Sequence, residues 1–600
     1  MNLTISSLHE AYKSKSLTPR QLVGNILKQY EHYADHNIWI YALSMDELEV
    51  YIQNLEAQDI DDLPLYGVPF AIKDNIDLAG IPTTAACAEF SYTPDKSAFV
   101  VEQLIKAGAI PMGKTNMDQF ATGLVGVRSP QPWGACKNAF NKDYIAGGSS
   151  SGSSVAVALG LASFSLGTDT AGSGRVPASF NNLIGLKPSK GLLSMSGVVP
   201  ACRSLDCVSI FALTTDDANT VLEQAASYDA QDQYARKIPF DNNIRQYGKP
   251  EGEFSFAVPK AEQLKFFGNE SAKKLFEQSV ETMQALGGIK HELDFTVFLD
   301  AAKLLYEGPW VAERYVAIEN IIQQQPEALL PVIKTIIGSA EGKTAMDFFK
   351  AEYQMQVYRA QSKDIIAKYD FILTPTAGTI YTIDDVNADP ITLNSNTGYY
   401  TNYMNLLDCS CVAVPAGFLA NGLPWGVSLV SAAMKDRKLL SFSNKFQQHN
   451  KIKPGNVDID LPESETTQVS YSDTIDLVVC GAHLDGLALN WQLKERGATL
   501  KQKTGSKKAY RMYVIKGEIE RPAMVRDDKA GSEIDIEIWT LPKSEFGSFV
   551  ANIPPPLGIG KVETRDGQKL PGFICEGYAV EGAKEITDLG GWRQYLSAKL

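Results

Sequence analysis

Apolar residues recur along this chain with two different spacings, which predict helices and strands in turn. Leu22, Ile26 and Leu27 have helical spacing. Thr18 followed by Pro19 predicts where their helix begins, because threonine caps a helix and proline suits its first turn. Further helices are predicted at residues 99–108, 155–161 and 271–286, and short apolar strands at 109–112, 162–166, 255–258, 290–295 and 371–375. Helices that alternate with short apolar strands predict an α/β architecture.

The composition changes between about residues 452 and 473. This stretch contains Pro454, Gly455 and Pro462 with acidic, serine and threonine residues and few aliphatic ones, which is typical of a linker. A chain of 600 residues also exceeds the size that one hydrophobic core usually organises. Further strands are predicted at 474–480, 509–515 and 532–539. We therefore expect a large domain at residues 1–455, a linker at 456–472 and a second domain at 473–600.

Charge and composition exclude several classes of protein. The 56 basic and 70 acidic residues give a net charge of −14, which repels nucleic acid and anionic membranes. The eight cysteines show no CxxC pair, so neither a disulfide scaffold nor a zinc module is indicated. The first residues do not read as a signal peptide, and no apolar run reaches the length of a membrane span. We expect a cytoplasmic protein that binds neither nucleic acid nor membrane.

One motif in the chain imitates a nucleotide site. Residues 108–115 match the phosphate-loop pattern G-x-x-x-x-G-K-[ST]. A true phosphate loop follows a strand and donates successive backbone N–H groups, whereas this segment follows a predicted helix and contains Pro111, which has no N–H. We therefore do not expect it to bind nucleotide.

Two glycine- and serine-rich segments are candidates for chemistry. Residues 147–154 read Gly-Gly-Ser-Ser-Ser-Gly-Ser-Ser, and residues 167–175 read Gly-Thr-Asp-Thr-Ala-Gly-Ser-Gly-Arg. A flexible tether is the simple interpretation of the first segment, but apolar residues flank it, and glycine there lets the backbone approach a ligand closely. A serine on such a turn, with neighbouring N–H groups free, is suited to nucleophilic attack.

A nucleophilic serine needs a base, and no histidine lies near either segment in the sequence. Lys73 lies inside an apolar run. Burial disfavours the charged form of lysine, so we expect its pKa to fall toward neutrality. The alternative is a structural lysine held in a buried ion pair.

Together these segments resemble the amidase signature family, over about residues 63–429. The similar stretches are 67–74, 113–118, 147–154, 167–178 and 185–189. The resemblance implies a fold with a central mixed sheet flanked by helices. It also implies a Ser-Ser-Lys triad, with Ser173 as nucleophile, Ser149 as the bridging serine after a cis peptide bond, and Lys73 as base. The N–H groups of Thr170, Ala171 and Gly172 would then hold the oxyanion.

The substrate is suggested by a finer resemblance, to the allophanate hydrolase branch of this family. The stretch 170–175 and the C-terminal stretches 479–490, 553–560 and 590–593 carry it. It implies hydrolysis of allophanate to ammonia and N-carboxycarbamate in urea degradation, with no metal or organic cofactor. The alternatives are an amidase for another small acid amide such as malonamate, a catalytically silent binding protein, or an amidotransferase subunit.

Allophanate carries a carboxylate, for which arginine is the suited partner because its paired donors match the two oxygens. The stretch 305–314 looks like the recognition segment of the branch, with Tyr306 and Arg314 about two helical turns apart on one helix. A surface arginine on an amphipathic helix is the alternative. We also expect a backbone contact to the substrate from Gly126.

The second domain resembles the small α+β fold of γ-glutamyl cyclotransferases. That fold's acidic residue has no counterpart here, since the comparable stretch at 553–556 reads Ile-Pro-Pro-Pro. The resemblance to allophanate hydrolases implies decarboxylation of N-carboxycarbamate by this domain, with His483 managing the proton. A docking or dimer-supporting role is the alternative. The family also implies a homodimer and a functional link to urea carboxylase, which would supply allophanate.

Overall fold

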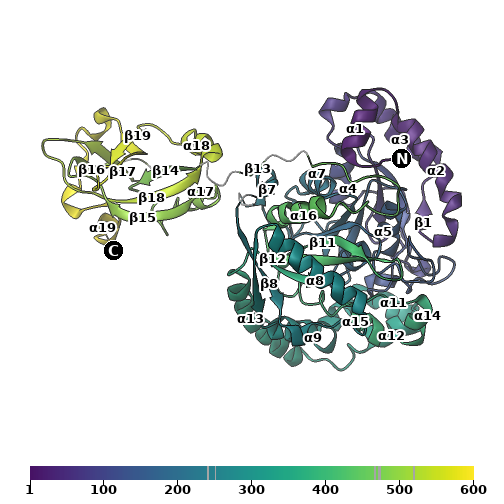
Figure 1. Cartoon of the computed structure of the whole chain (residues 1–600). Helices are drawn as coiled ribbons and strands as arrows, with labels where there is room; N and C mark the ends of the chain where they lie inside the picture. Colours follow the sequence, from purple (N-terminus) through teal and green to yellow (C-terminus); the bar gives the residue numbers. More distant parts are fainter. Residues whose placement is uncertain are drawn as a thin grey trace. The chain divides into compact units, whose positions relative to one another are not determined.

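The computed structural model in Figure 1 describes residues 1–239, 242–250, 252–464, 468–469, 474–515, 517 and 520–599. The chain divides into two compact units. Unit 1 comprises Met1–Ile238 and Ile244–Val469, and unit 2 comprises Pro239–Asn243 and Ser470–Leu600.

Unit 1 is built on a mixed sheet of 11 strands. Its order is β1-β3-β2-β4-β6-β5-β11-β12-β10-β8-β9. Strand β2 pairs in parallel with β3 and β4, whereas β4 pairs antiparallel with β6. The strands are β1 (Trp39–Ala42), β2 (Pro69–Lys73), β3 (Ile110–Thr115), β4 (Phe164–Asp169), β5 (Ile184–Lys187), β6 (Cys207–Ala212), β8 (Phe254–Pro259), β9 (Gly288–Leu293), β10 (Phe371–Pro375), β11 (Cys409–Phe418) and β12 (Pro424–Ala432). The expected α/β fold with a central mixed sheet is confirmed.

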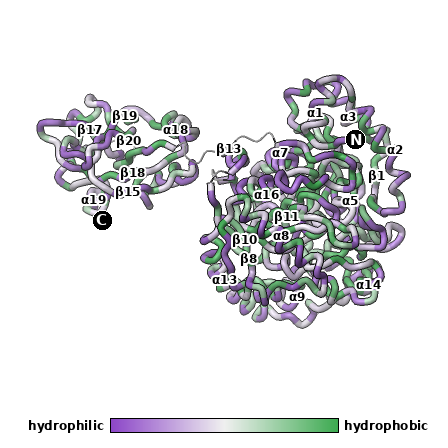
Figure 2. Tube along the Cα trace, viewed as in Figure 1, coloured by the Kyte–Doolittle hydropathy of each residue, from purple (hydrophilic) through white to green (hydrophobic). Residues whose placement is uncertain are grey.

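Helices surround this sheet, and hydrophobic residues gather between the two, on strands such as β10 and β11 (Figure 2). The helix that begins at Pro19 has the expected capping box on Thr18. The helices are α1 (Ile5–Lys13), α2 (Pro19–His32), α3 (Met45–Glu56), α4 (Phe99–Lys106), α5 (Ser151–Ala158), α6 (Val176–Phe180), α7 (Thr215–Ala225), α8 (Glu270–Ala285), α9 (Thr296–Glu307), α10 (Trp310–Ala317), α11 (Glu319–Gln324), α12 (Pro331–Gly338), α13 (Ala345–Ile366), α14 (Ile383–Ala388), α15 (Thr392–Thr397) and α16 (Asp436–Asn450). Among the described residues, no helix is both long and apolar enough to span a membrane.

The segment that imitates a phosphate loop is mostly strand. Residues 110–115 form β3 and are all buried. Lys114 Nζ lies 3.3 Å from Asp74 Oδ1 in a buried ion pair, and it also donates to Thr83 Oγ1. This lysine therefore has a structural role.

The predicted single helix across residues 305–314 is wrong. Helix α9 ends at Glu307 and α10 begins at Trp310. The break occurs at Gly308, whose backbone is extended, because a residue that precedes proline is hindered from the helical conformation. Tyr306 and Arg314 thus lie on two helices.

Part of the predicted linker at 456–472 is packed on unit 1. Asn456 donates from its backbone N–H to the Ala158 carbonyl and from Nδ2 to the Ala139 carbonyl. Ser464 Oγ donates to Asp216 Oδ1. At 468–469, β13 (Gln468–Val469) pairs with β7 (Lys249–Pro250). Backbone groups in this stretch find partners on the folded body, a feature that composition does not reveal.

Unit 2 contains a five-stranded sheet in the order β15-β18-β14-β20-β19 and a three-stranded sheet in the order β17-β16-β21. Trp539 and Leu477 lie in its own hydrophobic core. Its elements are β14 (Thr474–Val479), α17 (Trp491–Lys494), β15 (Thr499–Gly505), β16 (Tyr510–Ile515), β17 (Arg521–Arg526), β18 (Asp535–Pro542), α18 (Lys543–Val550), β19 (Leu557–Glu563), β20 (Lys569–Cys575), β21 (Lys584–Glu585) and α19 (Trp592–Ser597).

Candidate active site

Lys73 and Ser149, which are 76 positions apart in the sequence, meet inside unit 1. Lys73 ends the buried strand β2, and Ser149 lies just before α5. The Nζ atom of Lys73 is 2.7 Å from Ser149 Oγ and 2.7 Å from Thr168 Oγ1. The peptide bond between Gly148 and Ser149 is cis, as the family resemblance implies. The structure therefore brings together the amine and one hydroxyl of the expected triad.

Burial lowers the pKa of Lys73 to about 7, although Asp118, Asp206 and Asp169 oppose this shift. Lys73 is fully buried. Lys114 pairs with Asp74, but Lys73 forms no ion pair with any residue that the structure describes. Its amine is neutral in a large fraction of molecules near pH 7 and then has a lone pair that can accept a proton from Ser149.

Ser173 lies on the turn between β4 and α6 and is 3% exposed. Ser150, the residue after Ser149, connects the segment around Ser149 to this turn. Its Oγ donates a hydrogen bond to the carbonyl of Thr168, near the end of β4. Ser173 Oγ forms no hydrogen bond with a described residue, so no direct bond joins it to Ser149. Its role as nucleophile stays a proposal.

The carboxylate of Asp169 stabilises the turn that carries Ser173. It binds Arg175 through two hydrogen bonds, from Nε at 2.9 Å and from the terminal nitrogen Nη2 at 2.8 Å, and both side chains are fully buried. The same carboxylate accepts the N–H groups of Gly172 and Gly174, each at 2.9 Å. The buried ion pair between Asp169 and Arg175 therefore also stabilises the turn that carries Ser173.

Gly172 differs from the expectation that its N–H serves the oxyanion. That N–H points to the Asp169 carboxylate, because the backbone at Gly172 has a φ of 144° and curls back toward it. A Cβ there would lie 2.4 Å from Thr401 Oγ1, so glycine is required. Thr170 and Ala171 are then the backbone donors that we propose for the oxyanion.

Thr170 is held by a residue that the sequence did not reveal. Its hydroxyl donates to Asp206, whose carboxylate also accepts the N–H groups of Ala201 and Cys202. Burial raises the pKa of Asp206 to about 6 despite these donors. Thr168, the second partner of Lys73, was likewise missed, although it lies within the similar stretch 167–178. Neither residue has a distinctive local pattern.

Arg314 is buried beside Tyr306 and close to the triad. Its guanidinium carbon is 5.7 Å from the centre of the Tyr306 ring, and the side chain is 2% exposed. Its Nη1 donates to Thr122 Oγ1 at 3.2 Å and to the Ala121 carbonyl at 3.4 Å. Its Nε has no acceptor among the described residues. Nη1 of the guanidinium is thus anchored by two acceptors, while Nε has none.

Arg314 keeps its positive charge in the site and affects the pKa of Lys73. Burial disfavours its charge, but Cys202, Tyr306 and Asp206 outweigh this effect and raise its pKa. Its positive charge in turn helps lower the pKa of Lys73. The site therefore combines a fixed cation with a lysine that loses its proton easily.

Gly126 differs from its predicted role as a substrate contact through its amide. Its N–H donates to Asp118 Oδ2 at 3.1 Å, and Arg128 N–H donates to Oδ1 of the same carboxylate. Asp118 also donates its own N–H to the Ser149 carbonyl. Asp118 is a buried carboxylate and needs hydrogen-bond donors, so it binds the N–H groups of the loop that contains Gly126. Gly126 therefore positions the loop around Ser149.

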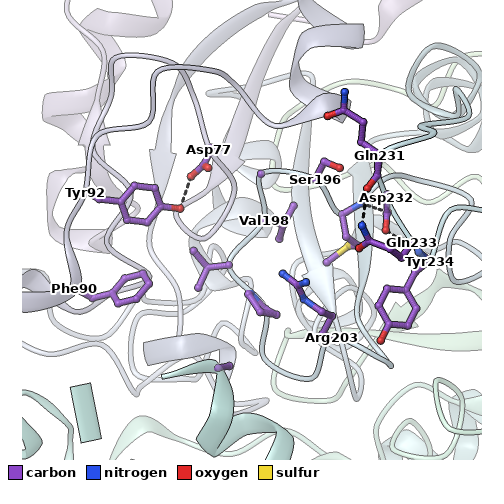
Figure 3. A pocket seen from close by; sticks show the side chains of 15 residues that line it. Asp77, Phe90, Tyr92, Ser196, Val198, Arg203, Gln231, Asp232, Gln233 and Tyr234 are labelled. Atoms are coloured by element: carbon purple, nitrogen blue, oxygen red, sulfur yellow. Dashed lines mark hydrogen bonds between the residues drawn. The ribbon is translucent and has the colours of Figure 1, made fainter. Parts of the chain in front are cut away.

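Unit 1 contains two hollows of similar size. One, of about 420 Å³, is lined by Tyr306, Gly398 and Asn402 among others. The other, of about 310 Å³, has Asp77, Tyr92 and Arg203 on its walls, with Tyr92 pointing its hydroxyl at Asp77 (Figure 3). Neither hollow is lined by a predicted triad residue or by Arg314.

His483 lies in unit 2 and lines a hollow of about 290 Å³ there. Its ring stacks on Phe573 with centres 5.0 Å apart, and its Nε2 is 3.0 Å from Gln492 Oε1. Burial lowers its pKa. Arg521 lines the same hollow, whose other walls are mostly apolar.

Each of the two units matches a known protein family. The amidase family matches residues 21–440, and the allophanate hydrolase C-terminal domain matches residues 475–597. Urea amidolyase of Saccharomyces cerevisiae is 41% identical over 606 residues, which cover 97% of this chain and 32% of that protein. The chain thus spans about a third of the length of this relative.

Two further proteins are similar to this chain over nearly all of their own length. The structure of Kluyveromyces lactis allophanate hydrolase has 37% identity and a TM-score of 0.75, over 100% of this chain and 99% of that one. One subunit of the glutamyl-tRNA(Gln) amidotransferase of Streptococcus pneumoniae is 30% identical over 74% of this chain and 96% of its own length. Since the family match spans most of unit 1 and the second match follows it in the chain, this protein belongs to the amidase family and carries an allophanate hydrolase C-terminal domain.

Proposed function

We propose that this chain hydrolyses allophanate to ammonia and N-carboxycarbamate in urea degradation. The observation that carries the proposal is Arg314, a buried cation beside Tyr306 whose Nε has no acceptor among the described residues. A carboxylate is the ligand that satisfies such a group best. The relatives named urea amidolyase and allophanate hydrolase support the same substrate.

The proposed reaction uses the buried lysine as its base. Neutral Lys73 accepts the proton of Ser149, Ser149 takes the proton of Ser173, and Ser173 Oγ attacks the amide carbon. The N–H groups of Thr170 and Ala171 bind the oxyanion. The proton returns through Ser149 to the leaving nitrogen, ammonia departs, and water hydrolyses the acyl-enzyme.

The activity should depend on the protonation of Lys73. Only the neutral amine accepts a proton, and its fraction rises as pH passes upward through the pKa of about 7. We expect kcat/KM to fall about tenfold between pH 8 and pH 6 and to level off above pH 8. A pH profile of kcat/KM measures this, and a rate that rises toward acid pH would contradict the assigned base.

For unit 2 we propose decarboxylation of N-carboxycarbamate, with His483 managing the proton. A largely apolar hollow that contains His483 and Arg521 supports this, because desolvation favours loss of carbon dioxide from an anion. Decarboxylation gives carbamate and carbon dioxide, and the carbamate then breaks down to ammonia and a second carbon dioxide, so allophanate would yield two molecules of ammonia in all.

Ammonia release by the purified full chain tests the proposed function. Allophanate, malonamate and acetamide are supplied side by side, and ammonia is counted per molecule consumed. We expect allophanate to react fastest and to give two ammonia, whereas His483→Ala should release the first promptly and the second with a lag. Faster turnover of malonamate would favour the rival amidase function, and no turnover of any of the three would favour an amidotransferase subunit or a silent protein.

We also propose a functional link to urea carboxylase and a cytoplasmic location. The relative named urea amidolyase is about three times as long as the region that this chain matches, which leaves room in it for a further enzyme domain. The eight cysteines here are all free, which suits a reducing compartment.

We propose a homodimer that forms through α13. Its apolar residues are unusually exposed, with Met346 at 70%, Phe349 at 54% and Tyr353 at 68%, and Phe348 and Val357 are also exposed. A second copy of this helix is a suitable occupant, because a twofold interface joins identical patches and so covers both apolar faces at once.

Light scattering should therefore give a mass near twice 65.5 kDa. Phe349→Asp should yield monomers with unchanged thermal stability of the fold at low concentration, because Phe349 does not lie in the protomer's core clusters. A monomeric wild-type chain at micromolar concentration would rule the proposal out.

A further inference from the structure

The hollow of unit 2 that His483 lines has an arginine on its walls and no acidic residue. Its volume of about 290 Å³ is close to the lower end of the range for small-molecule sites. Apart from His483, Arg521 is the one ionisable cation among the described residues that line it, and most other lining residues are apolar. A wall with a cation and without carboxylates attracts an anion. The hollow is therefore suited to a small acid.

Arg521 has donors that the protein itself does not use. Its Nη1 donates to the carbonyl of Pro555 at 3.4 Å, which is long for a hydrogen bond. Of the ion pairs between described residues of unit 2, none includes Arg521. A guanidinium stays charged at any physiological pH and carries five N–H donors in a planar fork. Arg521 can therefore bind a carboxylate without first losing another partner.

Gly481 allows Arg521 to lie next to the segment of His483. Pro522 packs on Gly481 so closely that a Cβ at position 481 would lie 2.2 Å from Pro522 Cγ. Arg521 directly precedes Pro522 at the start of β17, and His483 follows Gly481 by two positions. A larger residue at 481 would separate the two segments. The cation and the imidazole thus come to one hollow from segments in contact.

The ring of His483 has one nitrogen in use. Its Nε2 donates to Gln492 Oε1 at 3.0 Å, because a carbonyl oxygen only accepts. Its Nδ1 forms no hydrogen bond with any residue that the structure describes. The acidic neighbour Asp485 pairs with Lys494 and Lys503 and does not line the hollow. Nδ1 is therefore the nitrogen that remains for a ligand.

We propose that Arg521 binds one carboxylate of N-carboxycarbamate and leaves the other among the apolar side chains of the hollow. This inference rests on the proposed function and names the group that holds the second substrate. The intermediate is a dianion with two equal carboxylates, and the guanidinium binds one of them through parallel hydrogen bonds. The other loses its water among residues such as Phe549 and Phe573, which favours its departure as neutral carbon dioxide.

The proton and the electrons of this step are accounted for by His483. The C–N bond to the unpaired carboxylate breaks, carbon dioxide leaves, and the electron pair of the bond stays on nitrogen. That nitrogen takes the proton from Nδ1 of the imidazolium, whose charged form the bound dianion favours. Water then returns a proton to Nδ1. Carbamate remains on Arg521, departs and breaks down.

The time course of ammonia release from allophanate tests the inference in the full chain. Arg521→Ala should release the first ammonia at the wild-type rate and slow the second step about 10- to 100-fold. Arg521→Lys should slow it less, because the charge remains without the fork. Arg526→Ala is the matched control, since Arg526 ends the same strand, pairs with Asp528 and does not line the hollow. Its time course should equal that of the wild type.

Rescue by small cations separates binding from support of the fold. Guanidinium chloride, at a concentration too low to denature, should shorten the lag of Arg521→Ala, and imidazole should not. The reverse should hold for His483→Ala. A damaged fold would respond to neither cation selectively, and thermal denaturation of each variant gives an independent check.

The outcomes distinguish this inference from the proposed function. If His483→Ala shows a lag before the second ammonia and Arg521→Ala does not, or if guanidinium fails to shorten the lag of Arg521→Ala, only the role of Arg521 is overturned. If neither variant shows a lag, unit 2 does not catalyse the second step and both proposals for it fall. If the wild-type chain does not turn over allophanate, the inference falls with the proposed function.

Discussion

Lys73→Met should lower kcat/KM for allophanate by about 10⁴-fold or more. Methionine has similar length and no lone-pair nitrogen, so nothing accepts the proton of Ser149, which is 2.7 Å from Nζ in the wild-type chain. The loss should persist at every pH, because no titrating base remains. Steady-state ammonia release from pH 6 to pH 9 measures it.

The fold should survive this change, since Lys73 is fully buried and methionine avoids the cost of burying an amine. Thermal denaturation provides the control, and we expect a Tm at or above that of the wild type. Ser173→Ala should match the loss, because the two residues act in one relay. If Lys73→Met keeps more than about one hundredth of the activity, the lysine is not the base.

Arg314→Ala should raise KM for allophanate about 10²-fold or more and, at pH 9, leave the turnover of acetamide nearly unchanged, because Lys73 is then neutral with or without the charge that helps lower its pKa. Removing one member of a buried charge pair costs about 2–5 kcal/mol, and acetamide has no carboxylate that forms such a pair. Arg314 anchors through Thr122 and is 2% exposed, so the carboxylate would bind it away from water. Kinetics on both substrates measure the effect.

Arg314→Lys refines the test. It keeps the charge but loses the fork of parallel donors, so an intermediate KM for allophanate is expected. Equal losses on allophanate and acetamide in Arg314→Ala would instead mean that the arginine supports the fold, through its bonds to Ala121 and Thr122.

Local pattern predicted the framework of unit 1 well. Phe371–Pro375 is a strand at the expected residues, and α2 begins at the expected cap. These features depend on neighbours within a few positions, which periodicity and capping residues report directly. The break between α9 and α10 could also have been inferred, because Gly308 precedes a proline.

Supporting residues of the site were harder to predict. Asp206 holds Thr170 from 36 positions away, and Asp118 holds Gly126 instead of leaving its amide to substrate. A buried carboxylate binds whichever donors the fold brings to it, and sequence spacing does not say which those are. The contacts of Asn456 and of Gln468–Val469 could not be predicted for the same reason, because their partners lie in distant segments.

The sequence alone determined most strands and helices of unit 1 and the residue types able to perform amide hydrolysis, because each of these depends on local composition or on a motif. Only the tertiary structure decided that Lys73 touches Ser149 and that Gly172 and Gly126 give their amides to carboxylates. Burial and the competition for hydrogen-bond partners govern these contacts, and both arise only when segments far apart in the chain are packed together.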